Sequence, residues 1–322
     1  MMKMVRHVGS VSQKCPKRDY LRELSRNKYL YLLLLPSLVL YAIFNYAPMY
    51  GITLAFKEFN ARLGILGSPW VGFDKFELLI SNTRFWGVLL NTIKISFLRL
   101  LISTPAPILI AVLFSELSAK RTKKVLQTVY TLPHFLSWVI VSGIVLNVLD
   151  YDGLINGILA ALGMEKQIFL GNKKVFLPIL YIAEVWKGAG WTSVIYMAAI
   201  AGVSPDIYEA AELDGITRIK KIWYITLPSI APTIAMMFTL SVGSVLNAGF
   251  DSIFNLTNPA VESVSEILDT YVYKITFAMA PDFSFSTAVG LFKSVVNIII
   301  LLTVDGFSRK TMGVGVFAGG SK

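Results

Sequence analysis

The sequence predicts an all-α integral membrane protein with six transmembrane helices. Hydrophobic residues make up 55% of its 322 residues and only 16% are charged, compared with about 25% charged residues in a typical soluble domain. Six apolar segments are long enough to cross a bilayer, which takes about 20 mostly apolar residues. None of them alternates apolar and polar residues with the period of two that marks a membrane β-barrel.

The first three expected spans cover residues 29–50, 88–113 and 125–149. The first of them is the apolar run that follows a long basic tail. Prolines interrupt all three, at Pro36, Pro105, Pro107 and Pro133. Backbone groups freed by a proline are tolerated at membrane depth only where protein or a wet cavity satisfies them. Such breaks are common in transporters.

The last three expected spans cover residues 175–201, 227–250 and 285–304. Helix breakers interrupt the fourth and fifth, at Pro178, Gly188, Gly190, Pro228 and Pro232. The fourth and sixth spans also carry ionisable side chains. Because each such group costs about 2.5–3.5 kcal/mol near the bilayer centre, it is a candidate functional residue.

The basic residues indicate how the chain is oriented. Eighteen Lys and Arg residues lie in the N-terminal tail, the second and fourth connections and the C-terminal tail, whereas eight lie in the other three connections. Basic loops stay on the cytoplasmic side, so both termini are expected inside. We expect a basic cytoplasmic tail at 1–28, a transmembrane domain at 29–304 and a cytoplasmic C-terminal tail at 305–322.

The sequence gives little support for nucleic-acid binding, metal binding or catalysis. A net charge of +10 would suit a nucleic-acid binder, but orientation and contact with the lipid bilayer explain the basic tail. We therefore expect no nucleic-acid partner. Cys15 is the single cysteine, and His7 and His134 lie far apart, so neither a disulfide nor a metal site is expected. We find no candidate catalytic residues and no phosphate-binding loop.

The connection between the fourth and fifth spans, residues 204–226, predicts a short amphipathic helix, a glycine turn and a second short helix. Pro205 suits the first turn of a helix, and Gly215 ends that helix. Seven residues here and at the start of the fifth span fit the pattern EAA-x3-G-x9-I-x-LP. They are Glu209, Ala210, Ala211, Gly215, Ile225, Leu227 and Pro228.

This pattern resembles the glutamate-alanine-alanine signature of permease subunits of binding-protein-dependent ABC importers. The carbohydrate branch, and within it importers of oligosaccharides and polysaccharides of the alginate importer type, is what three segments resemble: LLLLPSLVLYAIFNYAPMYGITLAFKEFN, LPHFLSWVIVSGIVL and WKGAGWTSVIYMAAIAGVSPDIYEAAELDG. The resemblance implies a type I importer permease in a bacterial inner membrane. Its partners would be a second homologous permease, an ABC ATPase dimer carrying ATP and Mg, an extracytoplasmic solute-binding protein and a saccharide. The chain itself would be non-catalytic and hold no cofactor.

The resemblance also implies that the 204–226 connection is the coupling helix that docks on the ATPase. Small alanines allow close helix approach, and the glycine permits a tight reversal. The residues expected to couple this chain to ATP hydrolysis are Glu209, Ala210, Ala211, Asp214, Gly215, Ile225, Leu227 and Pro228.

Polar residues inside the spans are candidates for the substrate path: Glu184, Lys187, Trp191, Asn247, Lys293 and Asn297. The first three share one helical face, although Glu184 and Lys187 can instead neutralise each other. Lys293 has no acidic residue in its own span and is the strongest single candidate. Trp186, Trp191 and Phe250 could stack on sugar rings.

The charges inside the spans favour an anionic saccharide. Lys94, Arg99, Lys187 and Lys293 outnumber Glu184, and this positive surplus would suit a uronate oligomer. The connections at 56–87 and 251–284 are expected to face outward and to receive the binding protein. Trp70 and Phe73 are expected to anchor the chain at the membrane interface.

An ion-coupled secondary transporter is the alternative, with Glu184 or Asp251 as the coupling site. Such a transporter is expected to show an internal repeat and has no use for a coupling signature. We see no convincing repeat. An intramembrane enzyme is a third possibility, but the sequence offers neither a histidine–carboxylate metal cluster nor a nucleophile–base pair.

Overall fold

The computed structural model describes residues 26–278 and 281–312. Within these residues the regular elements are helices. An isolated antiparallel β-bridge pairs Lys57 with Trp70. The chain divides into two compact units, Met1–Thr53 and Leu54–Lys322. Each unit is described by itself.

The first unit is an apolar helix that begins as α2 (Lys28–Tyr41) and continues through a π-helical turn, η1 (Ala42–Tyr46). It leads into the 3₁₀ segment η2 (Ala47–Phe56), which crosses the boundary between the units. No residue of α2 or η1 is buried. A helix that is apolar all round and is not buried by protein is typical of a membrane span, where the lipid bilayer covers it.

Five stretches of the described residues are long and apolar enough to cross a membrane. They are Lys28–Phe56, Thr83–Ser115, Trp138–Ala161, Arg218–Val242 and Phe283–Lys310. The expected fourth span does form a 26-residue helix, α10 (Phe176–Ala201), but its composition is not apolar enough to belong to this set. The six-span count is therefore not confirmed, because Glu184, Lys187 and several small or polar residues reduce the hydropathy of α10.

The second unit opens with the short helices α3 (Gly64–Gly67) and α4 (Asp74–Ser81), followed by α5 (Thr83–Ser103) and α6 (Pro105–Ser115). The Asn82 side chain caps α5 by accepting hydrogen bonds from the backbone N–H groups of Arg84 and Phe85. Pro105 occupies the first position of α6, where its missing N–H costs least. The expected second span is thus present as two consecutive helices.

The expected third span, 125–149, is not one helix. It is divided into α7 (Lys120–Thr131), the 3₁₀ turn η3 (Leu132–Phe135) and α8 (Trp138–Leu149). Pro133 lies in the turn and Leu136 is extended, so the helix cannot continue through this point. Ser137 then caps α8, and α9 (Leu154–Ala161) follows it.

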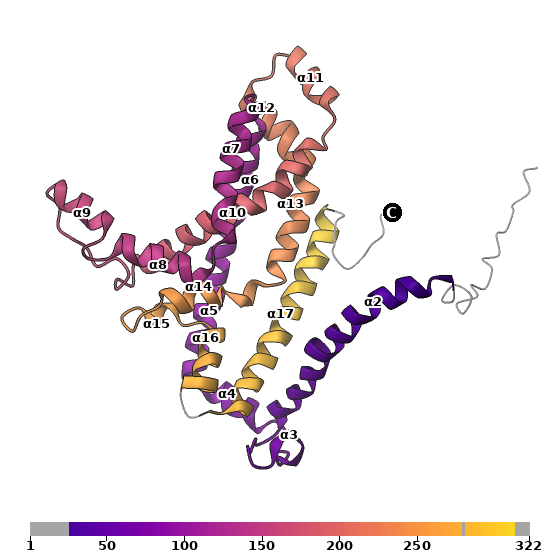
Figure 1. The fold of residues 1–322 in the computed structure, drawn as a ribbon, viewed down its shortest axis with the longest axis vertical. Helices are drawn as coiled ribbons and strands as arrows, with labels where there is room; N and C mark the ends of the chain where they lie inside the picture. Colours follow the sequence, from indigo (N-terminus) through magenta and orange to yellow (C-terminus); the bar gives the residue numbers. More distant parts are fainter. Residues whose placement is uncertain (1–25, 279–280, 313–322) are drawn as a thin grey trace, which may run out of the picture. The chain divides into compact units, whose positions relative to one another are not determined.

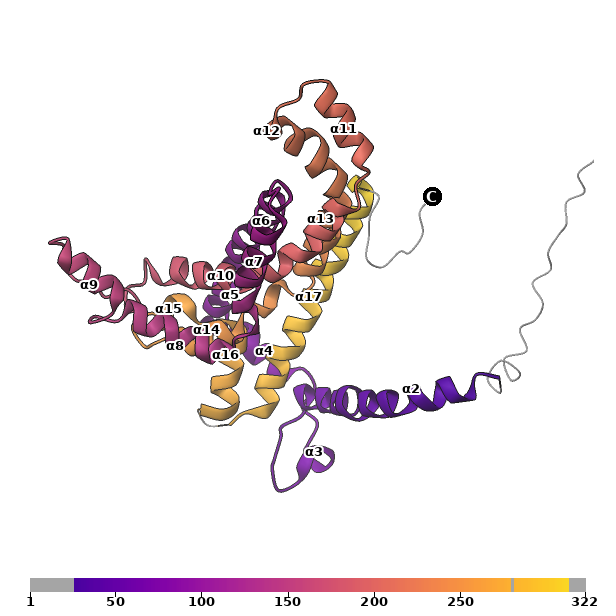
Figure 2. The same ribbon diagram turned by 45° about the horizontal axis from the view of Figure 1, so that its top comes forward.

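α10 is the central helix of the second unit and packs against α5, α6, α7 and α13. One apolar core lies between α6, α10 and α13, built from Ala111, Val112, Tyr196, Ile200 and Ile230. The core is possible because these positions recur on one helical face. Figures 1 and 2 show the short helices α11 (Pro205–Leu213) and α12 (Arg218–Lys221) at one end of this unit, and Figure 1 shows α4 near the other end.

The expected fifth span, 227–250, is also broken. α13 (Leu227–Val242) ends seven residues before α14 (Phe250–Leu256), and the 3₁₀ turn η5 (Val245–Asn247) lies between them. Gly249 has a φ of +79°, a left-handed backbone conformation that glycine adopts without steric cost. The break places α14 at an angle to α13, as Figure 1 shows.

The segment 251–284 is packed into the unit and is not only an outward-facing loop. It contains α14, α15 (Glu262–Ser265), α16 (Leu268–Tyr273) and the π-helical turn η6 (Lys274–Ala278), before α17 (Phe283–Met312) begins. Ile253, Leu256, Val261 and Ile267 belong to a core with α5 and α10. Asp269 therefore lies on the interior side of the bundle and not on the outer surface expected from the sequence.

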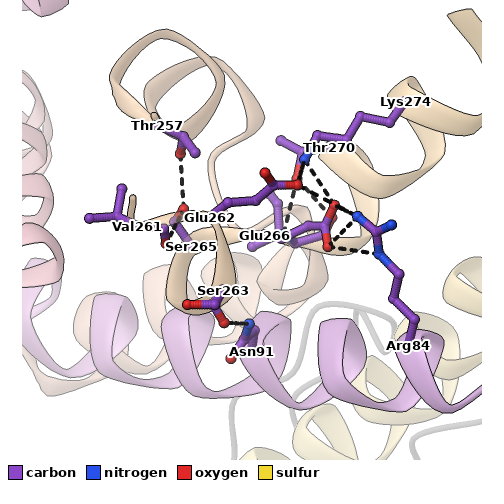
Figure 3. Close-up of polar contacts among 11 residues, drawn as sticks. Arg84, Asn91, Thr257, Val261, Glu262, Ser263, Ser265, Glu266, Thr270 and Lys274 are labelled. Carbon is purple, nitrogen blue, oxygen red and sulfur yellow. Dashed lines mark hydrogen bonds and ion pairs between the residues drawn. The ribbon is translucent and has the colours of Figure 1, made fainter. Parts of the chain in front are cut away.

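A charge cluster, formed by Arg84, Glu262, Glu266 and Lys274, ties this segment to the start of α5 (Figure 3). Arg84 Nη2 lies 2.9 Å from Glu266 Oε1, and Lys274 Nζ lies 2.9 Å from the same oxygen. Lys274 also donates to Glu262. Since Glu266 is almost fully buried while its partners are partly exposed, the cluster satisfies a carboxylate that would otherwise be unpaired.

Candidate functional site

The first candidate site is the helix–turn–helix projection of residues 204–226, here called the knob. The predicted arrangement is confirmed: α11 and α12 are separated by a turn at Gly215, whose φ is +71°. The N–H of Gly215 donates to the carbonyl of Glu212, and the N–H of Ile216 donates to the carbonyl of Ala211. These bonds close the end of α11 in the way that glycine-terminated helices commonly end.

The eight expected coupling residues divide into an anchored set and an exposed set. Ala211 is buried, and Ile225 and Leu227 are half-buried at the root of the knob. The exposed members are Glu209, Ala210, Asp214, Gly215 and Pro228. Lys221 steadies the knob from within, because its ammonium lies 3.3 Å from Glu212 Oε1 and 3.9 Å from Glu116 Oε1.

The knob also exposes large apolar side chains that the sequence did not single out as a group. Leu213 is 90% exposed, and Ile219, Trp223 and Tyr224 are exposed as well. Exposed apolar side chains on a projection are typical of surfaces that contact another protein or a membrane.

The second candidate site is an open cavity of about 700 Å³ lined by residues of α5, α6, α8, α10, α13, η5, α14, α16 and α17. Charged and amide side chains line it: Arg99, Asn247, Asp251, Asp269 and Lys293. Trp138, Tyr196 and Phe250 line it too. Such a mixture of aromatic faces and hydrogen-bonding groups is what ligand pockets present.

Arg99 forms an ion pair with Glu184 at the wall of the cavity. Arg99 Nε lies 2.9 Å from Glu184 Oε2, and the Glu184 side chain is only 3% exposed. The other oxygen, Oε1, accepts a hydrogen bond of 2.8 Å from Ser252. A β-carbon at Gly249 would collide with Arg99, Ser252 and Glu184, so glycine is required beside this pair.

Lys293 is paired across the bundle, although its own helix carries no acidic partner for it. Its Nζ lies 2.5 Å from Asp269 Oδ1, which joins α17 to α16. Both side chains line the cavity. The lysine that the sequence singled out therefore does reach the cavity, but as half of an ion pair.

The other expected path residues are placed elsewhere. Lys187 donates to the carbonyl of His134 over 2.8 Å, so the interpretation that Glu184 and Lys187 neutralise each other is wrong. Trp191 stacks on the His134 ring with centroids 4.8 Å apart. Asn297 donates to the carbonyl of Gly243. Of the six expected path residues, Asn247 and Lys293 line the cavity.

The positive surplus expected inside the membrane is absent from the cavity wall. Arg99 and Lys293 are matched there by Asp251 and Asp269, and Glu184 adds a negative charge behind the wall. The sequence argument failed because it placed Asp269 in an outer loop. The apolar spacing of Leu268 and Tyr271 around Asp269 is the signal that would have placed this residue on a packed helix.

Comparison with known proteins decides the family. The model of the binding-protein-dependent transport system inner membrane component matches residues 103–313. The chain belongs to this family. The permease is 40% identical to the polygalacturonan/rhamnogalacturonan transport system permease protein YteP of Bacillus subtilis (strain 168), over 95% of this chain and 96% of that one. It is equally similar to Protein LplB of the same organism, 40% identical over 93% of this chain and 94% of that protein.

Two solved structures resemble the permease throughout. One is a bacterial ABC transporter involved in the import of the acidic polysaccharide alginate, with a TM-score of 0.84, 36% identity and coverage of 91% of this chain and 99% of that chain. The other is a bacterial alginate ABC transporter in complex with an alginate pentasaccharide-bound periplasmic protein, with the same TM-score and identity and coverage of 92% and 99%. The permease thus has the type I importer fold, and it is a non-catalytic, multi-pass component of the inner membrane.

Proposed function

We propose that this permease forms half of the translocation path of an ATP-driven importer for oligosaccharides derived from acidic polysaccharides. The observation that carries the proposal is the similarity over more than nine tenths of the chain to permeases whose names specify polygalacturonan, rhamnogalacturonan or alginate. Net charge in the cavity does not support the acidic preference, because the cavity wall is balanced.

The proposed assembly contains a second homologous permease, an ABC ATPase dimer with ATP and Mg, and an extracytoplasmic solute-binding protein. The knob, with its exposed Leu213, Ile219 and Tyr224, is the proposed ATPase contact. The distribution of Lys and Arg supports a cytoplasmic knob and cytoplasmic termini. Termini 1–25 and 313–322 lie outside the described residues.

The proposed transport cycle uses the knob as a mechanical link. ATP binding closes the ATPase dimer, and the knob follows because its exposed apolar side chains are held in the ATPase. Ala211, Ile225 and Leu227 join the knob to the bundle, so the displacement reaches α13. α13 ends at the backbone break beside the cavity, which gives the movement a route to the substrate.

Substitution of Gly215 tests the coupling role. Proline cannot adopt a φ of +71°, whereas asparagine tolerates the left-handed region. In proteoliposomes containing the full importer, Gly215→Pro should abolish ATP-driven uptake of an oligogalacturonide, and Gly215→Asn should retain most of it. Both variants should insert into the membrane. Unchanged uptake with Gly215→Pro would overturn the proposed role of the knob.

A further inference from the structure

Arg99 is the guanidinium of the cavity wall, and it has hydrogen-bonding capacity to spare. A guanidinium carries five N–H donors; Arg99 uses Nε in its ion pair with Glu184, and within the described residues no hydrogen bond engages its two terminal nitrogens. Lys293 donates one hydrogen bond to Asp269, and its ammonium lacks the planar fork of a guanidinium. Arg99 is 33% exposed and lines the cavity.

A buried neighbour, the hydroxyl of Ser96, has no hydrogen-bond partner in the part of the chain that the structure describes. Ser96 lies one helical turn before Arg99 on α5 and lines the same cavity. Buried polar groups are nearly always hydrogen-bonded in native structures. The spare donors of Arg99 and the hydroxyl of Ser96, which line one wall of the cavity, therefore indicate that a ligand with hydrogen-bond acceptors completes this site.

The chemistry of the wall favours a carboxylate as that ligand. A guanidinium fork matches a carboxylate geometrically and can bind it through two parallel N–H···O bonds. Asp251 and Asp269 oppose anions by charge, so recognition here must come from directed hydrogen bonds. Glu184 and the backbone at Gly249 hold Arg99 in place, because any side chain at Gly249 would displace the guanidinium. The site is thus preorganised.

We propose that Arg99 is the residue of this permease that recognises the carboxylate of a uronate unit in the cavity. This inference rests on the proposed function and adds the group that the cavity recognises. Glu184 acts through Arg99 as a positioning residue, and Lys293 with Asp269 contributes a neutral pair that meets hydroxyls.

The test compares an oligogalacturonide with its fully methyl-esterified form of the same length, in proteoliposomes holding the complete importer. Arg99→Lys keeps the charge but lacks the fork, and Arg99→Gln removes the charge. Both variants should lower the ratio of acid to ester uptake by about tenfold or more, mainly through a higher KM for the acid. Lys94→Gln is the matched control, because Lys94 is an exposed residue of the same helix that does not line the cavity.

Glu184→Gln is expected to change the ratio of acid to ester uptake in the opposite direction, and it leaves Arg99 in place. The amide keeps nearly the shape that positions Arg99 but removes its counter-charge, so the ratio of acid to ester uptake should rise. Equal losses for acid and ester with Arg99→Lys, in a complex that still assembles, would overturn the inference while leaving the proposed function intact. Failure of the unmodified importer to transport either saccharide with ATP would instead overturn the proposed function.

Discussion

At the scale of single residues, Gly190 shows how tightly α10 is packed. A β-carbon at Gly190 would overlap the backbone carbonyl of Tyr130 on α7, whereas one at Gly188 would meet nothing within 4 Å. Both glycines lie on the same helix. Alanine at Gly190 therefore reports the loss of stability from disturbing a close helix contact. Alanine at Gly188 reports the gain in stability from replacing a glycine within a helix.

We predict that Gly190→Ala destabilises the permease by about 1–3 kcal/mol through overpacking. Gly188→Ala should be neutral or stabilising by about 0.5–1 kcal/mol, because alanine loses less backbone entropy in a helix. Thermal unfolding of the purified protein in detergent measures both. Equal melting temperatures for the two variants would contradict the close crossing of α7 and α10.

The charge cluster of Figure 3 makes stability depend on pH. The hydrogen bond from Lys274 lowers the pKa of Glu262, so this carboxylate stabilises the fold above its ordinary pKa of 4.5 and stops doing so as the pH falls through the lowered value. Burial opposes the charge of Lys274, but hydrogen bonds to Glu262 and Glu266 outweigh it and raise its pKa. Its contribution is full below pH 10.5 and is lost only as the pH rises through the raised value.

Glu262→Gln should therefore lower the free energy of unfolding by up to about 1 kcal/mol at neutral pH, a small effect because both partners are partly exposed. The difference from the unmodified protein should shrink below about pH 4. Glu165→Gln, at an exposed glutamate outside the cluster, is the control and should have no effect. A difference that stays constant from neutral to acid pH would show that the ion pairs do not stabilise the fold.

The charged residues of the spans can be read from the sequence, but their partners cannot. Glu184 and Lys187 are close in sequence, yet each contacts a residue from another helix, Arg99 or His134. Lys293 has its partner 24 residues away on α16. Ion pairs between helices depend on how the helices pack, which the spacing within one helix does not contain.

At the scale of elements, the knob was predictable because its signals are local. A proline at the first turn, acidic residues and a terminal glycine define α11 within a few residues. The breaks in the expected third and fifth spans were not predictable in position. Hydropathy averages over a window as long as a bilayer crossing, so the turn at Pro133 and the seven residues between α13 and α14 are absorbed into apolar runs.

The knob offers a prediction about its exposed apolar surface. Leu213→Glu adds a charge to the proposed ATPase contact, and a charge buried without a partner is costly. Stimulation of ATP hydrolysis by substrate-loaded binding protein should fall about tenfold or more, with folding unchanged. Leu162→Glu is the matched control: Leu162 is 71% exposed at the end of α9, outside the knob and outside the connections expected to receive the binding protein. Equal behaviour of the two variants would contradict the contact.

At the scale of the whole molecule, the chain is built to be completed by other components. Every described residue of α2 is exposed despite its apolar composition, which a bilayer or a neighbouring subunit covers. In the proposed assembly a second permease would complete the translocation path that this cavity begins. The exposed apolar surface of α2 and the exposed apolar side chains of the knob are the surfaces that such components would cover.

The dependence of transport on ATP tests this account most directly. Uptake of a radiolabelled oligogalacturonide should be measured in proteoliposomes with the permease alone, and with its partner permease, ATPase and binding protein. We predict that uptake occurs only in the complete complex and only with ATP inside the compartment that the knob faces. Uptake by the permease alone, driven by a proton or sodium gradient, would contradict the account.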